Sequence, residues 1–126
     1  NAGFTAGTPW LRVNPNYHEI NIQDDIIHMD SIVGFYKRAI ALRRAHPVLV
    51  AGAYAPIAPE HPRVLAFTRT NEGEKLLVLI NLGKKSAKIK LPGLRGAECL
   101  LYTHASRAFA QELRLLPYEG LVYKLA

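Results

Sequence analysis

The stretch that decides the fold is residues 64–91, VLAFTRTNEGEKLLVLINLGKKSAKIKL. It contains two runs of apolar and β-branched residues, 64–70 and 76–82, and then the alternating run 87–91. Runs of this length, separated by segments with Asn, Gly and Ser, are typical of antiparallel strands joined by turns. The run 76–82 is almost wholly apolar, which predicts a central strand covered on both faces.

The strand pattern continues toward the carboxyl end. Residues 97–102 and 121–125 are two further strand-like runs. The segment between them, residues 103–116, is ambiguous, and we favour a loop and a short strand over a short helix at 106–116. Short strands at this spacing predict that residues 47–126 form an antiparallel β-sandwich, so the fold class is mainly β.

One helix is expected before the strands, at residues 31–45. Asp30 or Ser31 is placed to cap its first turn, and Pro47 follows its end. Apolar side chains recur with the helical period of 3.6 residues and form one stripe, made of Ile32, Phe35, Tyr36, Ala39, Ile40 and Leu42. Such a stripe must be buried against a partner.

Residues 1–30 are expected to form a loop. They contain four asparagines, several glycines and prolines, and no sustained hydrophobic period. A structureless stretch of this length is uncommon inside a compact domain, and is usually functional, disordered or separated from the structure that it packs on.

Composition excludes several classes of protein. The 126 residues are 49% hydrophobic and 21% charged, as in ordinary globular domains, and no apolar run approaches a membrane span. The net charge of +6 comes from scattered basic residues, which disfavours a nucleic-acid module. The single cysteine, Cys99, allows no internal disulfide and fits a reducing compartment, so a cytoplasmic location is expected.

Six motifs in order resemble the α-amylase superfamily, glycoside hydrolase family 13, in its oligo-1,6-glucosidase, α-glucosidase and trehalose-6-phosphate hydrolase branch. They are Asn1-Ala2-Gly3-Phe4-Thr5, Pro9-Trp10-Leu11 with Val13-Asn14-Pro15-Asn16-Tyr17, the helix with His46-Pro47-Val48-Leu49, Pro59-Glu60-His61-Pro62 with Val64-Leu65-Ala66-Phe67, residues 76–82, and Leu116-Pro117-Tyr118-Glu119-Gly120-Leu121-Val122-Tyr123. The resemblance covers nearly the whole chain and is weakest at residues 93–114.

The resemblance implies that the chain is the carboxyl-terminal portion of an α-glucosidase-type enzyme. Residues 1–46 would be the end of a (β/α)8 barrel, namely the loop after strand 8 and helix 8, and residues 47–126 the terminal sandwich. The rest of the barrel would be the partner of the helix in cis, and the substrate of the complete enzyme an α-linked oligosaccharide. The abrupt start at Asn1 fits a fragment.

No catalytic residue is assigned to this chain. Retaining glycosidases need two carboxylates about 5–5.5 Å apart, and the resemblance places the family's catalytic carboxylates before Asn1. Asp24 and Asp25 are the only adjacent acidic pair, and a role as cap or surface residues suffices for them. The histidines lack metal-ligand spacing and there is no glycine-rich phosphate loop, so neither a metal nor a cofactor is expected.

Phe4 is the one candidate substrate-binding residue. The active site of a (β/α)8 enzyme is built from loops at the carboxyl-terminal face of the barrel, and the resemblance places the first loop on that rim. Phe4 can present its ring to a sugar there. The alternative is that Phe4, like Trp10, only pins the loop to the barrel.

Two further possibilities stay open. The sandwich can be a carbohydrate-binding module if its aromatic rings form an exposed row; those rings are Tyr54, Phe67, Tyr102, Phe109, Tyr118 and Tyr123. The chain alone can also form a homodimer, because an uncovered helix stripe is an apolar patch that soluble monomers seldom tolerate.

Overall fold

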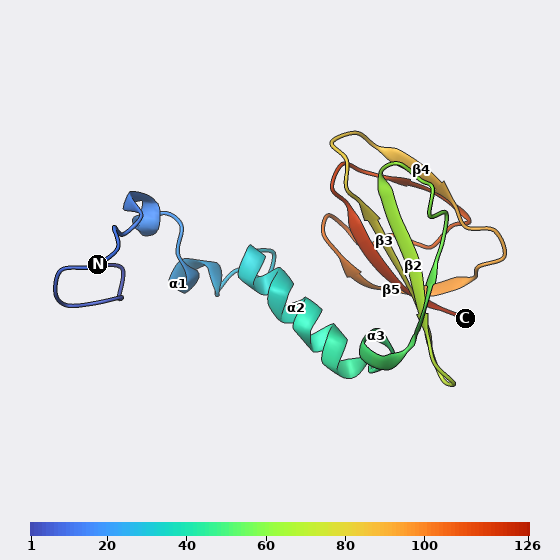
Figure 1. Ribbon diagram of the computed structural model, residues 1–126, viewed down its shortest axis with the longest axis horizontal. Coiled ribbons are helices and arrows are strands. Elements are labelled where there is room, and N and C mark those ends of the chain that lie inside the picture. The colour runs from blue at the N-terminus through green and yellow to red at the C-terminus, as the bar shows by residue number, and fades with distance from the viewer. The chain divides into compact units, whose positions relative to one another are not determined.

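The computed structural model describes residues 1–126, except for the side chain of Ala97. The chain divides into two compact units, Asn1–Arg38 and Ala39–Ala126. Helices and turns make up the first unit, and strands dominate the second (Figure 1). The boundary between the units lies within helix α2 (Ile32–Ala45).

The first unit contains two single helical turns, η1 (Pro15–His18) and α1 (Ile22–Asp25). The expectation of a loop throughout residues 1–30 is therefore wrong at these two places. Proline at the first position already has the backbone angle that η1 needs. The side chain of Asn21 caps α1 by accepting a hydrogen bond from Asp24 N at 2.8 Å.

The expected helix is confirmed as α2. Ser31 is its cap, because its hydroxyl accepts a hydrogen bond from Gly34 N at 3.0 Å. A second cap comes from further away in the chain: the carboxylate of Asp25 accepts from Val33 N at 2.9 Å. Two otherwise unpaired amide groups of the first turn are therefore satisfied by side chains.

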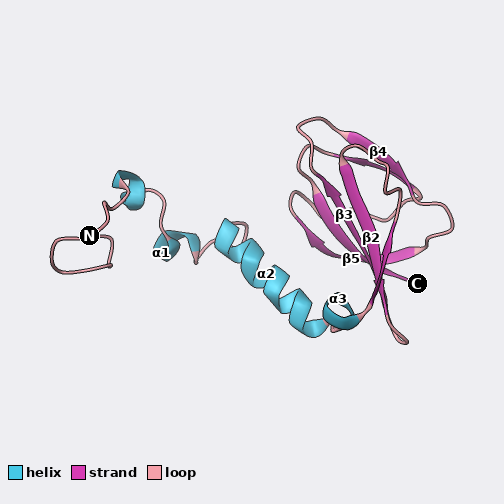
Figure 2. Ribbon diagram, viewed as in Figure 1, coloured by secondary structure: helices cyan, strands magenta, loops and turns pink.

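The second unit is an antiparallel sandwich, as expected (Figure 2). One sheet has five strands in the order β1-β2-β3-β7-β5, and the other pairs β4 with β6. The strands are β1 (Ala53–Pro56), β2 (Val64–Thr70), β3 (Lys75–Asn81), β4 (Ala87–Lys90), β5 (Gly96–Tyr102), β6 (Glu112–Leu115) and β7 (Gly120–Leu125). The short strand favoured within residues 103–116 is β6, whereas β1 was not expected.

The core lies between the two sheets. Alternate residues of β2, β3, β4, β6 and β7 point into it, as the two-residue period of a strand requires. It is formed by Val64, Ala66, Leu77, Leu79, Ala87, Ile89, Leu91, Leu113, Leu115, Leu121, Tyr123 and Leu125. Burying large apolar side chains contributes roughly 1.5–3 kcal/mol each, so this cluster is the main source of stability.

The outer face of the five-stranded sheet is covered only in part. Leu76 of β3 is fully buried, but Val78 and Ile80 on the same face are half-buried. A short helix that was not expected, α3 (Val48–Ala51), contacts β2 and β3, and Arg69 on this face donates to the carbonyl of Val50 at 2.9 Å. The expectation that residues 76–82 are covered on both faces therefore holds completely only for the inner face.

Candidate functional site

The loop that carries Phe4 is closed by its own hydrogen bonds. The side-chain amide of Asn1 donates to the carbonyls of Thr5 at 3.1 Å and Gly7 at 2.8 Å. The hydroxyl of Thr5 accepts from Gly7 N, and Phe4 N donates to the carbonyl of Asn1 at 3.0 Å. These bonds fold residues 1–7 into a compact turn and present Phe4 on it.

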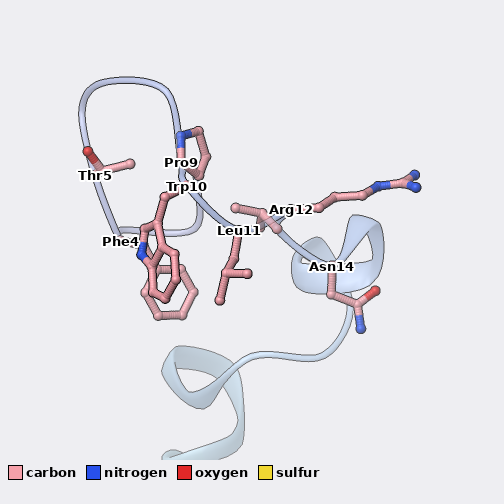
Figure 3. Close-up of a pocket in the computed structure, with 8 residues that line it drawn as sticks. Phe4, Thr5, Pro9, Trp10, Leu11, Arg12 and Asn14 are labelled. Carbon is pink, nitrogen blue, oxygen red and sulfur yellow. The ribbon is translucent and has the colours of Figure 1, made fainter.

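Phe4 lies in a concavity of about 530 Å³ (Figure 3). Its lining combines apolar and polar side chains: Phe4, Thr5, Pro9, Trp10, Leu11, Arg12, Val13 and Asn14. The rings of Phe4 and Trp10 are 82% and 92% exposed, so neither is pinned by any other part of this chain. The sequence pointed to Phe4 and Trp10, but it gave no specific signal for Arg12, which also lines the concavity.

This arrangement is suited to binding rather than to catalysis. Sites for small ligands commonly combine apolar and aromatic surface with a few polar groups that set orientation. Here the exposed rings offer flat apolar faces, and Arg12 and Asn14 add polar side chains to the lining, with the Arg12 guanidinium directed away from the rings (Figure 3). No carboxylate lines the concavity, so these residues do not provide the acid and nucleophile that glycoside hydrolysis requires.

The adjacent acids Asp24 and Asp25 have structural partners. Asp24 accepts a hydrogen bond from the side chain of Asn21 at 2.9 Å, and Asp25 caps α2. Three other acids take part in ion pairs: Glu74 with Lys124, Glu112 with Lys88, and Glu119 with Arg107; Glu74 is also hydrogen-bonded to His46 Nδ1 at 2.7 Å. Among the described side chains, no group of three or more His, Cys, Asp or Glu residues could hold a metal ion.

The aromatic rings of the sandwich do not form an exposed row. Tyr123 is fully buried, whereas Tyr54 and Tyr118 are 53% and 63% exposed. Tyr54 pairs with Arg69 near the β2–β3 hairpin, while Tyr118 lies beside Gly83, just beyond the other end of β3. The two exposed rings are therefore at opposite ends of the sheet, which counts against a carbohydrate-binding face of the usual coplanar kind.

Within the part of the chain that the structure describes, no helix has the length and apolar character needed to cross a bilayer.

Comparison with known proteins agrees with this division into a helical first part and a strand-rich second part. Residues 1–52 match the family described as "Alpha amylase, catalytic domain", and residues 64–122 match the "Alpha-amylase SusG C-terminal domain". The chain therefore belongs to the α-amylase superfamily, glycoside hydrolase family 13, and corresponds to its carboxyl-terminal region.

Within that family the chain is similar to oligo-1,6-glucosidases and trehalose-6-phosphate hydrolases. It is 39% identical to the oligo-1,6-glucosidase of Parageobacillus thermoglucosidasius and 36% identical to the trehalose-6-phosphate hydrolase of Bacillus subtilis, with 99% of the chain matched in each case. The solved structure of the trehalulose synthase MutB from Pseudomonas mesoacidophila MX-45 matches 100% of the chain at 39% identity and a TM-score of 0.92.

The chain spans only 23% of the length of each of these three relatives. The activities that name them belong to proteins about four times as long. The division of this chain into residues 1–46 and 47–126 stays a prediction.

Proposed function

We propose that this chain is part of an enzyme that hydrolyses α-linked gluco-oligosaccharides with retention of configuration. The observation that carries the proposal is the 39% identity to an oligo-1,6-glucosidase across 99% of the chain. In the proposed enzyme, a (β/α)8 barrel supplies the nucleophile and the general acid. The reducing compartment suggested by the single cysteine supports a cytoplasmic location.

In this enzyme Phe4 contacts the sugar substrate at the rim of the active site. The support is its 82% exposed ring within a concavity that also offers Arg12 and Asn14. A stacking contact of this kind acts on the bound sugar and not on bond breaking. Its loss is expected to raise KM more than it lowers kcat.

The sandwich serves as a structural platform for the barrel. Its outer sheet face carries the exposed Leu65 and the half-buried Val78 and Ile80, an apolar surface that needs a cover. α3, which falls within the stretch matched to the catalytic domain, already contacts this sheet. The rest of the barrel is the proposed cover, and a second copy of the chain is the competing one.

The experiment compares the 126-residue chain with the complete enzyme, using p-nitrophenyl α-glucoside. The chain alone is expected to show no turnover above background, and the complete enzyme to be active. Phe4→Ala in the complete enzyme is expected to raise KM about 3- to 10-fold, the range of one aromatic contact. Ile20→Ala is the matched control, because Ile20 is 72% exposed and does not line the concavity. Turnover by the chain alone would refute the structural role.

Light scattering on the isolated chain tests whether a second copy of the chain covers the apolar surface when the barrel is missing. A dimer is expected when the barrel is missing, since soluble monomers seldom leave a contiguous apolar patch exposed to solvent. Phe35→Asp is expected to shift the dimer toward monomer if the α2 stripe forms the contact, because the charge would be buried without a partner. A clean monomer at tens of micromolar would contradict self-association.

A further inference from the structure

Tyr118 has a backbone conformation that large residues rarely adopt. Its φ angle is 56°, in the left-handed region, and its side chain is 63% exposed. For a bulky residue this conformation is strained, and strained residues persist only where the surroundings impose them. Because the surroundings keep Tyr118 in a strained conformation that exposes its ring to solvent, the ring is a candidate for contact with a ligand.

The residue after Tyr118 is held firmly in place. Glu119 is fully buried, and its carboxylate accepts a hydrogen bond from Leu116 N at 2.7 Å and two from Arg107 Nη1 at 3.1 and 3.2 Å. Tyr118 N donates to the carbonyl of Gly83 at 3.2 Å. The turn that carries the ring is therefore fixed from both sides.

A second buried side chain joins this turn to the loop after β3. The amide of Asn81, 1% exposed, donates to the carbonyls of Leu116 at 2.7 Å and Lys85 at 2.9 Å, and it accepts from Gly83 N at 3.0 Å. Because one amide group bonds to both segments, residues 82–85 and 116–119 form one rigid surface.

This surface is positively charged. Lys84 and Lys85 are exposed on the loop after β3. Arg63 is also exposed, accepts a backbone hydrogen bond from Leu82 N at 2.8 Å, and packs its side chain against Gly83. The one acid within residues 61–64, 82–86 and 114–119 is Glu119, which is buried and paired with Arg107. Three exposed cations therefore lie on the backbone segments that meet at Tyr118, and residues 61–64, 82–86 and 114–119 carry no free carboxylate.

We propose that this end of the sandwich binds a sugar that carries a phosphate group, with the sugar ring on Tyr118 and the phosphate among Arg63, Lys84 and Lys85. An aromatic face supplies apolar contact for the ring, and Lys and Arg supply charge-assisted hydrogen bonds to phosphate. The choice of a sugar as the ligand rests on the proposed function. The choice of a phosphate group on that sugar rests only on the positive charges of Arg63, Lys84 and Lys85. The site shares no residue with the Phe4 concavity.

Binding to the 126-residue chain is measured by NMR titration with glucose 6-phosphate, glucose, inorganic phosphate and uridine 5′-monophosphate. Glucose 6-phosphate is expected to shift the amides of residues 82–86 and 116–119, and to bind at least about tenfold more tightly than the other three probes. Equal binding of inorganic phosphate would reduce the site to a charged patch. Equal binding of glucose would remove the role of the cations, and equal binding of the nucleotide would indicate a nucleic-acid surface. Each of these results overturns the proposal.

The Tyr118→Asn variant distinguishes the contribution of the ring to binding from its contribution to folding. Asparagine tolerates the left-handed backbone, so this variant keeps the turn and loses only the ring. It is expected to weaken glucose 6-phosphate binding about 5- to 10-fold, within the range of a single stacking contact. Tyr54→Asn removes a similarly exposed ring from strand β1 and is expected to change nothing.

A second variant tests the charges. Lys84→Gln with Lys85→Gln is expected to lower the affinity for glucose 6-phosphate to that for glucose. Unchanged binding by either the Tyr118 or the lysine variant, with the fold intact by circular dichroism, would refute the site. These results are independent of turnover by the complete enzyme, so failure of this proposal and failure of the proposed function are distinguishable.

Discussion

Each of the two units of the chain is stabilised internally by a different kind of interaction. In Asn1–Arg38 the one buried residue is Gly34, and side chains such as Trp10 and Ile27 are more than 70% exposed. In Ala39–Ala126 twelve residues from two sheets form a continuous core. The first unit is shaped by hydrogen bonds between near neighbours, and the second by contacts between distant strands. Local hydrogen bonds can specify turns, but they add little stability without apolar burial.

Amide hydrogen exchange should show this difference most strongly. Amides in residues 1–30 are expected to exchange at least about 10³-fold faster than those of β3, because opening β3 breaks the whole core whereas opening the loop breaks a few local bonds. The measurement is NMR-detected exchange on the isolated chain. Similar protection in both regions would mean that the first unit has found a cover, such as a second copy of the chain.

Glu119→Ala is expected to lower the free energy of unfolding of the second unit by about 3 kcal/mol, because it leaves Arg107 and Leu116 N without their buried partner. Urea denaturation measures the effect. Glu112→Ala is the control: Glu112 is exposed and its contact with Lys88 is 3.9 Å long, so a loss below about 0.5 kcal/mol is expected. Equal losses would show that burial of Glu119 is unimportant.

Gly34→Ala should damage the first unit selectively. A Cβ atom at Gly34 would lie 2.8 Å from the carbonyl oxygen of His28, so the preceding turn must move away from α2. A cost of roughly 1–3 kcal/mol is expected for such overpacking. The signature is faster exchange at the start of α2 with unchanged protection of β3. At Gly73 an added Cβ would meet nothing within 4 Å, and Gly73→Ala should therefore leave both regions unchanged.

Tyr123→Phe tests the core of the second unit at high pH. The Tyr123 hydroxyl is buried without a hydrogen-bond partner among the described residues, and burial, supported by Cys99 and Glu119 and opposed by Arg107, raises its pKa to about 12. A raised pKa means that the folded state favours the neutral phenol. Stability from this group is therefore complete below its unfolded pKa of about 10 and is lost as pH rises through about 12.

Between pH 8 and pH 11 the native chain is thus expected to lose about 1.4 kcal/mol relative to Tyr123→Phe. Near pH 8 the variant should be equal or slightly more stable, because it removes an unsatisfied polar atom. Urea denaturation at both pH values gives the difference. A variant clearly less stable at pH 8 would show that the hydroxyl has a partner, such as a buried water.

The strands and the long helix were predictable because their signals are local and repeated. The run 64–70 is β2 residue for residue, and residues 31–45 differ from α2 by one position. The short elements α3 and β1 escaped prediction, because neither four-residue segment shows the alternation of apolar and polar residues that marked β4. The expectation that 76–82 is covered on both faces was too broad, since coverage depends on what packs against the sheet.

The sequence by itself determined the sandwich, the long helix and the family, and it proposed Phe4 as the candidate sugar contact; that Ser31 and not Asp30 caps the helix is known only from the structure. Only the tertiary structure decided that Asp25 caps α2, that Asn81 joins two loops, and that Glu119 is buried under a strained Tyr118. The physical reason is that periodicity and caps act between near neighbours, whereas the partners of a buried polar group are fixed by where distant segments meet.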